Sequence, residues 1–407
     1  MGIAAQPENR RANAKANLLA MEWHSVCISE DGKQTSPANT KTRMPSILPQ
    51  LPTSQRAITQ DADGRPQLTD GVALPMLLPG TVLVKTTAMA LNPSDYKMGT
   101  AFPTPGAIVG MDFAGTVIRI AGGTETDLVV GDTICTAVHG SNPAEPGNGA
   151  FAEYVRVPAN MLLRVPASLG PVQASTLGTA LSTCIMALWG DKALALSSAP
   201  DTVADTLFPS PPVLVYGGST ATGTIAIQLL KLSGYDPITT CSPHNFDLVR
   251  SRGASAAFDY TSPDVAAAIK THTGGRLKYA LDCIADPQSV DVCYRAIQRV
   301  GGRYASLELV SDELLRKRRA VKPAFVMAPE VYGSEVKLAR GYERPANAEN
   351  QKLAVRFFRV FQRLIDEGKL VAHPSQVLEG GLDGVLAGLD LLKSGSVSGK
   401  KFVALME

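Results

Sequence analysis

The sequence predicts an α/β protein in which a β-rich first domain precedes a parallel, doubly wound sheet. Three observations carry this prediction. Short β segments broken by glycine and proline run from about residue 44 to 166, and short buried strands alternate with helices from residue 213 onward. A glycine-rich turn joins the first of these later strands to the helix that follows it. Strands that alternate with helices form parallel sheets, because each helix carries the chain back to the same edge.

The length and composition allow two hydrophobic cores. The chain has 407 residues, of which 45% are hydrophobic and 19% charged, and one domain usually takes about 100–200 residues. We expect the β-rich domain over residues 44–195, the doubly wound domain over 196–345, and a segment, 346–407, that returns to the first domain. Residues 1–43 are polar and rich in Asn, Ala and Lys, so we expect a disordered tail that ends near Met44.

Three strands are expected in the first domain. Residues 81–86 and 113–118 are rich in β-branched and apolar side chains, and residues 151–157 alternate in polarity after a Gly-Asn-Gly turn signal. Residues 192–212 are rich in Ala, Ser and Pro, which predicts a surface loop.

The elements of the second domain follow in order. Ile225, Leu229 and Leu232 recur at helical spacing after the glycine-rich turn, and Gly234 is placed to end that helix. A second helix is expected over residues 246–252, and two more over 353–367 and 382–393. The expected strands are 213–216, 237–241, 256–260, 279–282, 303–306 and a last one at 401–405.

Charge and cysteine usage exclude several classes of protein. The net charge of +2 argues against a nucleic-acid partner, and the one basic run, Arg316 to Arg319, is typical of a solvated helix face. The six cysteines form no CxxC pair, which indicates reduced thiols. No stretch approaches the ~18 consecutive apolar residues of a membrane span, and no apolar signal core is present at the N-terminus. We therefore expect a soluble, cytoplasmic protein with no membrane partner.

The glycine-rich turn is a candidate dinucleotide site. It reads Gly-Gly-Ser-Thr-Ala-Thr-Gly over residues 217–223, and it lies between a buried strand and a helix. The N–H groups and the dipole of such a helix can hold a pyrophosphate, and the hydroxyl groups add further donors. The motif departs from GxGxxG, so a turn without any ligand remains the alternative.

The end of the second strand of this domain bears on the choice of cofactor. NAD enzymes commonly place a carboxylate there to hold the ribose hydroxyls, but residues 241–245 read Cys-Ser-Pro-His-Asn, with no acid before Asp247. Hydroxyl, imidazole and amide groups can donate to a 2′-phosphate that a carboxylate would repel. NADPH is therefore favoured over NADH. Ser242 and Asn245 also suit the cap of the next helix, and both roles can hold at once.

The residues of the first domain cannot build a zinc site. Zinc members of this architecture need several thiolate and imidazole ligands there. Between residues 45 and 240 the chain has one histidine, His139, and two cysteines, Cys135 and Cys184. The cysteines are interpreted as small apolar packing groups, and no metal is expected.

Several motifs resemble those of a known superfamily. The run Leu-Asn-Pro-Ser-Asp-Tyr-Lys (91–97) resembles the signature of zinc-free, quinone-reductase-type medium-chain reductases, and Gly-Met-Asp (110–112) stands where zinc alcohol dehydrogenases have Gly-His-Glu. Val-Gly-Asp (130–132) and Ser-Gly-Lys-Lys (398–401) also occur in this superfamily. Residues 215–222, 240–248 and 279–284 resemble the trans-acting enoyl reductases of fungal polyketide pathways. The resemblance covers about residues 44–407.

This resemblance implies a GroES-like first domain, a Rossmann second domain and NADPH in the cleft between them. The implied cofactor contacts are Ser94, Asp95, Tyr96, Lys97, Ser219, Thr220, Ala221, Thr222, Ser242, Pro243, His244, Asn245, Tyr260, Leu307, Glu308, Ser398 and Gly399. Thr183 would face the nicotinamide. The implied walls of the acyl pocket are Cys184, Ile185, Met186, Ala187, Leu188, Trp189, Gly190, Asp191, Pro329, Glu330, Val331, Tyr332 and Gly333. Met186 and Tyr332, the larger of these, also suit an ordinary core.

The implied reaction is the reduction of an α,β-unsaturated thioester on the carrier protein of a polyketide synthase or of a synthase–peptide synthetase hybrid. Hydride delivery to the β carbon creates an enolate, so polar groups must stand beside the thioester oxygen. Lys97 and Thr183 are the catalytic candidates, although Lys97 equally suits a helix's first turn or a cofactor phosphate. Solvent can supply the proton. The long, charged stretch 308–344 favours a monomer.

Two other functions fit the same sequence, because a fold alone does not determine a function. One is a stand-alone NADPH-dependent quinone or enone oxidoreductase. The other is an NADPH-binding protein without catalysis. Turnover of a carrier-bound enoyl chain but not of free quinones would distinguish the trans-acting enoyl reductase from the quinone or enone oxidoreductase. Cofactor binding without turnover of any enone would indicate the non-catalytic protein.

Overall fold

The computed structural model describes residues 50–203 and 209–406. The tail expected over residues 1–43, its end near Met44 and Cys27 lie outside the described residues. Three sheets form in the described chain. None of its helices combines the length and the apolar character needed to cross a membrane.

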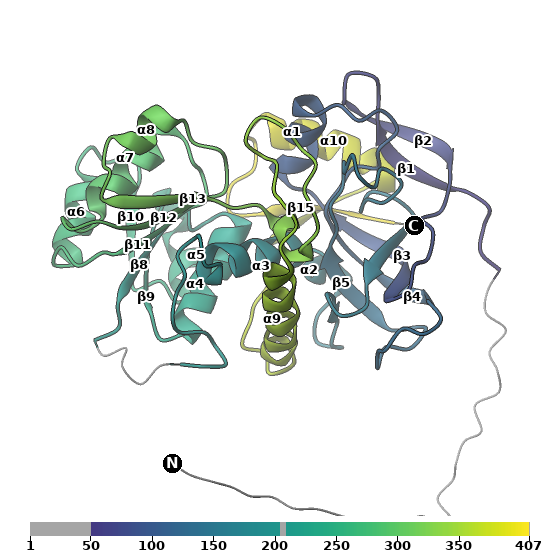
Figure 1. Ribbon diagram of the computed structural model, residues 1–407, viewed down its shortest axis with the longest axis horizontal. Coiled ribbons are helices and arrows are strands. Elements are labelled where there is room, and N and C mark those ends of the chain that lie inside the picture. The colour runs from purple at the N-terminus through teal and green to yellow at the C-terminus, as the bar shows by residue number, and fades with distance from the viewer. Residues whose placement is uncertain (1–49, 204–208, 407) are drawn as a thin grey trace, which may run out of the picture. The chain divides into compact units, whose positions relative to one another are not determined.

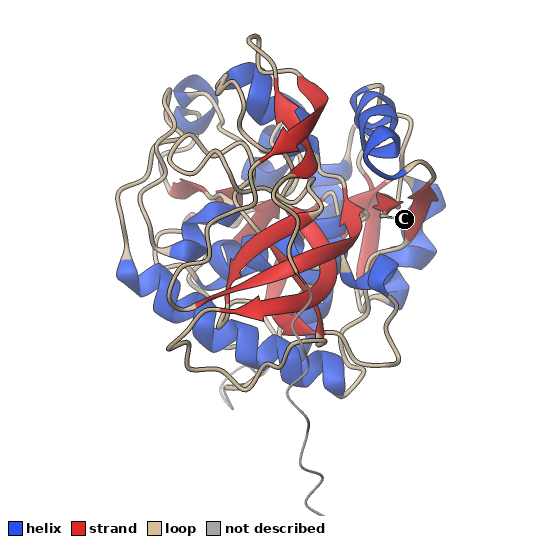
Figure 2. Ribbon diagram, turned by 90° about the vertical axis from the view of Figure 1, so that its right-hand side faces the viewer, coloured by secondary structure: helices blue, strands red, loops and turns tan. Residues whose placement is uncertain are grey.

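A seven-stranded sheet occupies the first part of the chain, and it is completed by the C-terminus. Its strand order is β14-β15-β3-β4-β5-β7, with β6 also paired to β3. All pairs are antiparallel except β14 with β15. Figure 2 looks onto this sheet, whose strands curve around one another. The strands are β3 (Thr81–Ala90), β4 (Asp112–Ile120), β5 (Thr133–Ala137), β6 (Tyr154–Pro158), β7 (Leu163–Arg164), β14 (Ser375–Leu378) and β15 (Lys401–Leu405). A separate hairpin joins β1 (Gln55–Gln60) to β2 (Pro66–Val72).

A six-stranded parallel sheet forms the second part, which confirms the predicted fold class. Its order is β10-β9-β8-β11-β12-β13, and every pair is parallel. The strands are β8 (Pro212–Tyr216), β9 (Asp236–Cys241), β10 (Ala256–Asp259), β11 (Tyr279–Asp282), β12 (Gly302–Ser306) and β13 (Val321–Phe325). The chain winds outward from β8 to β10 and then crosses to β11, so the winding direction reverses between β8 and β11.

Helices cover both faces of the parallel sheet, which explains why its central strands are apolar throughout. Val213 and Val215 of β8 pack in one core with α4 (Ala221–Leu232), α5 (Phe246–Ser251) and α9 (Ala348–Asp366). Leu214 and Tyr216 point to the opposite core with α6 (Val265–His272) and α7 (Pro287–Ala296). The short helix α8 (Asp312–Arg316) contacts α7 at the end of the molecule that Figure 1 shows on the left.

The remaining helices link the two larger sheets or cover the antiparallel one. α2 (Pro171–Ala174) and α3 (Gly178–Cys184) contact strands of the antiparallel sheet, and α3 also packs on α4. α3 continues directly into a π-helical turn, η1 (Ile185–Trp189). α9 contacts η1, β7 and the 3-10 turn η3 (Ala328–Tyr332). α1 (Pro93–Ala101) and α10 (Gly381–Lys393) contact each other, and η2 (Pro243–Asn245) precedes α5.

Two expectations about local structure need correction. The strand expected at 151–157 begins at Tyr154, because Phe151 is already bonded, through its backbone, to Val109 and Ile58 outside any ladder. The described part of 192–212 has no long element, as expected, but it is not a surface loop. Leu194 and Leu196 are buried in the core beside η1, because apolar side chains interrupt its Ala- and Ser-rich sequence.

Candidate active site

The glycine-rich turn is shaped by close backbone contacts. Gly217 has φ of +79°, a conformation that glycine adopts without strain. A Cβ on Gly223 would lie 2.4 Å from the carbonyl oxygen of Gly217. Thr220 caps α4, since its Oγ1 accepts from the N–H of Gly223 at 3.0 Å. The turn therefore brings the N-terminus of α4 against the end of β8, the arrangement in which a helix end can hold a pyrophosphate.

A second group of predicted cofactor residues meets beyond β9. The Nε2 atom of His244 lies 3.0 Å from Oγ of Ser398, and Nδ2 of Asn245 donates to the same oxygen at 3.0 Å. Gly399 approaches so closely that a Cβ would lie 2.5 Å from Oδ1 of Asn245. The structure thus joins residues about 150 positions apart in the sequence, and their side chains remain half-exposed or exposed except that of Asn245. Ser242 lies beside them at the end of β9.

A cleft of about 320 Å³ lies between the two larger sheets. It opens at the carboxyl ends of β8 and β11, where the winding direction of the parallel sheet reverses, which is the place where doubly wound sheets bind their ligands. The predicted residues that line it are Ser94, Lys97, Thr183, Thr220, Ala221, Thr222, Leu307, Glu308 and Pro329. The cleft therefore brings both catalytic candidates together with the glycine-rich turn.

Lys97 and Thr183 differ in their surroundings. The Lys97 side chain is 53% exposed, and its Nζ lies 3.9 Å from Oε2 of Glu308. Thr183 is 6% exposed, near the end of α3. The charged group therefore stands at the mouth of the cleft, and the hydroxyl lies in its wall.

The other predicted residues of the α1 and β10 regions lie outside the cleft lining. Tyr96 packs against the core of the antiparallel sheet, and Asp95, in the first turn of α1, is 3% exposed. Tyr260 packs on the core beside α6 and α7, and its carbonyl oxygen accepts from Nε2 of Gln288. Their predicted contacts with a cofactor stay predictions.

The predicted acyl-pocket walls are mostly tied into the core. Residues 184–189 are all buried, and Trp189 donates to the carbonyl of Ser198 at 2.9 Å while its ring stacks on Phe357. Tyr332 donates to the carbonyl of Ala137 at 2.6 Å. Of the two wall segments, only Pro329 is among the residues that line the cleft. The apolar lining that sequence reasoning missed includes Met98, Phe102, Met111, Phe325, Met327 and Leu338.

A buried network of charged groups lies directly behind the cleft. Asp112 and Lys401 form an ion pair in which the two side chains are 0% and 4% exposed. The Nζ of Lys401 also donates to Oδ1 of Asn92 at 2.8 Å, and Oδ1 of Asp112 accepts from the N–H of Thr179 at 2.6 Å. The network thereby ties β15, β4, the start of α1 and the start of α3 to one another. The motifs containing Asp112 and Lys401 were visible in the sequence, but nothing there indicated this pairing.

Asp95 belongs to the same buried region and has an unusual pKa. Burial raises the pKa of its carboxyl to about 8, although the N–H of Asn92 donates to its Oδ2 at 2.6 Å. Its Oδ1 is buried and has no hydrogen-bond partner among the described residues. Both observations fit a protonated carboxyl in the folded protein near neutral pH.

Replacing Asp95 with Asn is expected to flatten the pH dependence of stability. The folded state holds a proton on Asp95 that the unfolded state, with an ordinary pKa near ~3.9, releases above pH ~4. This proton stabilises the fold at low pH, and the stabilisation is lost as pH rises through about 8. The slope for one proton is at most ~1.4 kcal/mol per pH unit. Urea unfolding of both proteins between pH 5 and 8 measures the difference, and two parallel curves would contradict this assignment.

The described residues do not provide a zinc site. They contain no group of three or more His, Cys, Asp or Glu side chains placed to hold a metal ion. Cys135 and Cys184, the cysteines of the first domain, are buried free thiols. Burial raises the pKa of the Cys135 thiol far above its usual value, which suits a protonated packing group.

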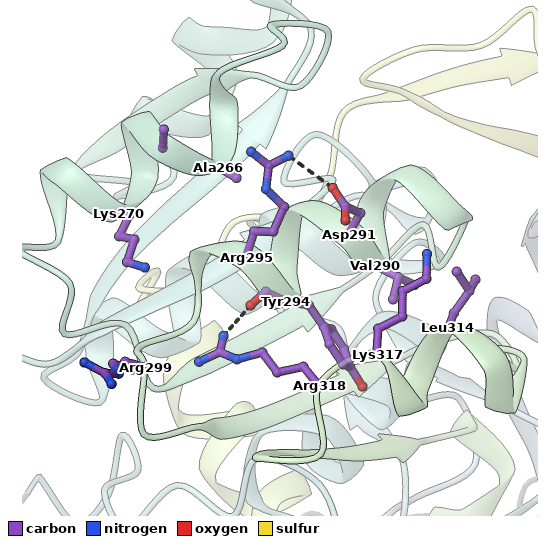
Figure 3. A pocket seen from close by; sticks show the side chains of 11 residues that line it. Ala266, Lys270, Val290, Asp291, Tyr294, Arg295, Arg299, Leu314, Lys317 and Arg318 are labelled. Atoms are coloured by element: carbon purple, nitrogen blue, oxygen red, sulfur yellow. Dashed lines mark hydrogen bonds and ion pairs between the residues drawn. The ribbon is translucent and has the colours of Figure 1, made fainter.

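A second hollow lies on the outer face of the parallel sheet, among α6, α7 and α8 (Figure 3), with a volume of about 650 Å³. Its lining is basic, but two of its arginines have partners within the fold. Arg318 donates to the carbonyl of Ile297 at 2.7 Å, and Arg295 pairs with Asp291. In the basic run itself, Arg316 is an exposed partner of Asp312, and Arg318 satisfies carbonyls at the end of α7. No predicted site residue lines this hollow, so the cleft is the candidate active site.

Comparison with known proteins places the chain among dehydrogenases and reductases. Residues 78–167 match the model of the alcohol dehydrogenase GroES-like domain, and residues 221–339 match that of the zinc-binding dehydrogenase. The second name does not fit the donor set described above. Among solved structures, an alcohol dehydrogenase superfamily protein from Novosphingobium aromaticivorans aligns with a TM-score of 0.68 at 24% identity, over 87% of this chain and 100% of that one. The CurK enoyl reductase aligns with a TM-score of 0.67 at 16% identity, over 87% and 99%. These likenesses show the fold.

The sequence relatives are much closer. The trans-enoyl reductase TwmE of Talaromyces wortmannii is 55% identical over 365 residues, which cover 88% of this chain and 99% of that protein. The trans-enoyl reductase poxP of Penicillium oxalicum is 46% identical over 361 residues, covering 88% and 94%.

Proposed function

Because the chain belongs to the trans-enoyl reductases, a family of the medium-chain dehydrogenase/reductase superfamily, we propose that it reduces the α,β double bond of carrier-bound polyketide thioesters with NADPH. The observation that carries the proposal is the cleft in which Ser94, Lys97 and Thr183 stand beside the glycine-rich turn. A nicotinamide cofactor follows from the family. When bound, it supplies a hydride.

Two groups of residues support the proposed binding of NADPH. The turn at residues 217–223 presents the start of α4, where N–H groups can hold phosphate. His244, Asn245 and Ser398 form a cluster of hydrogen-bond donors and acceptors beyond β9, suited to a 2′-phosphate. Asp259 pairs in register with Cys241, but its carboxylate already accepts from the N–H and the hydroxyl of Thr261. These features support NADPH over NADH.

The proposed substrate binding rests on the apolar side chains that line the cleft beside its polar groups. Met98, Met111, Met327 and Leu338 give it the character of an acyl-binding surface. We assign Thr183 to hold the substrate near the nicotinamide, and Lys97 to act either beside the thioester or on the cofactor's phosphate. The segments 184–191 and 329–333 would then support this surface from behind, with Pro329 in contact with it.

The proposed partner is a polyketide synthase, or a synthase–peptide synthetase hybrid, that presents the substrate on its carrier protein. We propose that the enzyme itself is a cytoplasmic monomer with the domain limits 44–195, 196–345 and 346–407. The edge strand β13 supports the monomer, because Pro323 has no N–H to donate and Lys322 is exposed. Proline and lysine on an edge strand oppose pairing with a second copy.

Incubating the purified protein with NADPH and a 2-enoyl chain on a carrier protein tests the proposal. We expect loss of NADPH absorbance and a saturated product detected by mass spectrometry, with free quinones turned over poorly. Turnover of quinones without reduction of the enoyl chain would indicate a stand-alone quinone reductase instead. NADPH binding without turnover of any enone would indicate a non-catalytic protein.

A further inference from the structure

Polar atoms without hydrogen-bond partners gather at the wall of the cleft. Nε2 of His139 and Oγ1 of Thr179 are buried and have no partner among the described residues, and both residues line the cleft. Oγ of Ser141, two residues further along the chain, is in the same state. A buried polar atom left without a partner costs roughly 1–3 kcal/mol. Such atoms are rare in folded proteins, so the two in the wall of this cleft, on His139 and Thr179, indicate a ligand that supplies the missing bonds.

The backbone holds His139 in place from both sides. The N–H of Val138 donates to the carbonyl of Met111 at 2.8 Å, and the N–H of Ser141 donates to that of Ile108 at 2.7 Å. Between them, Gly140 lies so close to Gly110 that a Cβ would meet its carbonyl oxygen at 2.1 Å. The ring of His139 is therefore presented to the cleft by a segment that has little freedom to move.

The ring also stands where negative charge can be stabilised strongly. Two other polar groups of the lining differ from it: Lys97 is half-exposed at the mouth, and Asn92 already accepts from Lys401. The Nε2 atom of His139 is buried, and a hydrogen bond from a buried donor to an anion acts at low dielectric, where it is stronger than in water.

We propose that His139 is a catalytic residue that donates a hydrogen bond to the thioester oxygen of the substrate, with the hydroxyl of Thr179 as a second donor. This inference rests on the proposed enoyl reduction. The hydride, with its two electrons, forms the new C–H bond at the β carbon, and the π electrons move to leave an enolate on the thioester oxygen. His139 keeps its proton and stabilises that oxygen. A proton from water then adds to the α carbon.

The protonation state of the ring agrees with this role. Burial lowers the pKa of His139 to about 4, so the imidazole is neutral at pH 7. A neutral imidazole is a poor acid, but it retains one N–H that can donate to an oxyanion. The ring therefore suits hydrogen bonding to the enolate better than delivery of the proton to the α carbon.

Three substitutions test the inference, with a 2-enoyl pantetheine thioester as the probe. His139→Leu removes the donor, whereas His139→Asn and His139→Gln keep an amide N–H near the position of Nδ1 or of Nε2. We expect Leu to lower kcat by about 10²–10³-fold, the usual effect of losing one oxyanion donor. At least one amide variant should regain about tenfold of that loss. His272→Leu, the same change at an exposed position away from the cleft, should leave kcat unchanged.

Two further measurements separate catalysis from packing. Because Nε2 has no partner to lose, Leu should leave the melting temperature unchanged or raise it, and the Kd for NADPH should stay constant. The inference is overturned if Leu changes kcat by less than about threefold, or if all three variants lose equal activity together with stability. If the unaltered protein binds NADPH but does not reduce the probe, the proposed function fails, and this inference with it.

Discussion

Replacing Lys401 with Met is expected to lower the free energy of unfolding by about 3–5 kcal/mol, the usual cost of removing one partner from a buried ion pair. The substitution leaves the carboxylate of Asp112 in a site that is fully buried, without its counter-ion. It also removes the donor to Oδ1 of Asn92. Chemical denaturation monitored by tryptophan fluorescence measures the loss.

Two further variants test whether the loss of stability comes from the buried ion pair. Lys400→Met makes the same change at the exposed neighbouring position and should alter stability by less than about 0.5 kcal/mol. Asp112→Asn combined with Lys401→Met should recover part of the loss, because the amide is neutral and its oxygen can still accept from Thr179. A Lys401→Met protein as stable as the unaltered one would show that the pair does not hold the four segments together.

NADPH is expected to bind roughly 10–100-fold more tightly than NADH, since a charge-assisted contact contributes ~1.5–3 kcal/mol. The 2′-phosphate would meet Ser242, His244 and Asn245, which bring no carboxylate to the end of β9. Titration of both cofactors by fluorescence measures the ratio. Equal affinities for the two cofactors would show that Ser242, His244 and Asn245 do not contact the 2′-phosphate.

A charge placed at the same position sharpens the test. Ser242→Asp should weaken NADPH binding about tenfold relative to the unaltered protein, because a carboxylate repels a phosphate at short range. NADH binding should change much less. Ser251→Asp places the same charge at the exposed end of α5 and should leave both affinities nearly unchanged. Equal weakening of both cofactors by Ser242→Asp would indicate a local distortion rather than an effect on the phosphate.

The elements predicted well were those whose signals are local. The strand β8, the turn after it and α4 were predicted because an apolar run, glycines and helical spacing follow one another directly. The strand β13 was missed, because Pro323 and Lys322 oppose a strand assignment and only pairing with β12 creates it. Local sequence predicts an element when its own residues suffice, and it fails when a distant neighbour decides.

In the candidate site, too, features with a local sequence signal were predicted and those that depend on distant residues were not. The glycine-rich turn was identified from its own residues. Lys400 and Lys401 are adjacent and chemically identical, yet one is exposed and the other is buried against Asp112, 289 positions earlier. His139 entered the sequence argument only as a histidine too isolated to build a zinc site. Its place in the cleft depends on how residues 138–141 bond to residues 108–111, which no sequence spacing reveals.

The position of β15 has a consequence for how the protein is made. This strand pairs with β3, and Lys401 bonds to Asn92, 309 residues upstream. During synthesis, residues 88–90 of β3 therefore lack their strand partner until residues 403–405 have left the ribosome. Contacts so distant in sequence form slowly, and unpaired strand edges are prone to aggregation. Ser398, three residues earlier, bonds to the cluster beyond β9. A chain that stopped before Ser398 would therefore lack both β15 and the serine that bonds to His244 and Asn245.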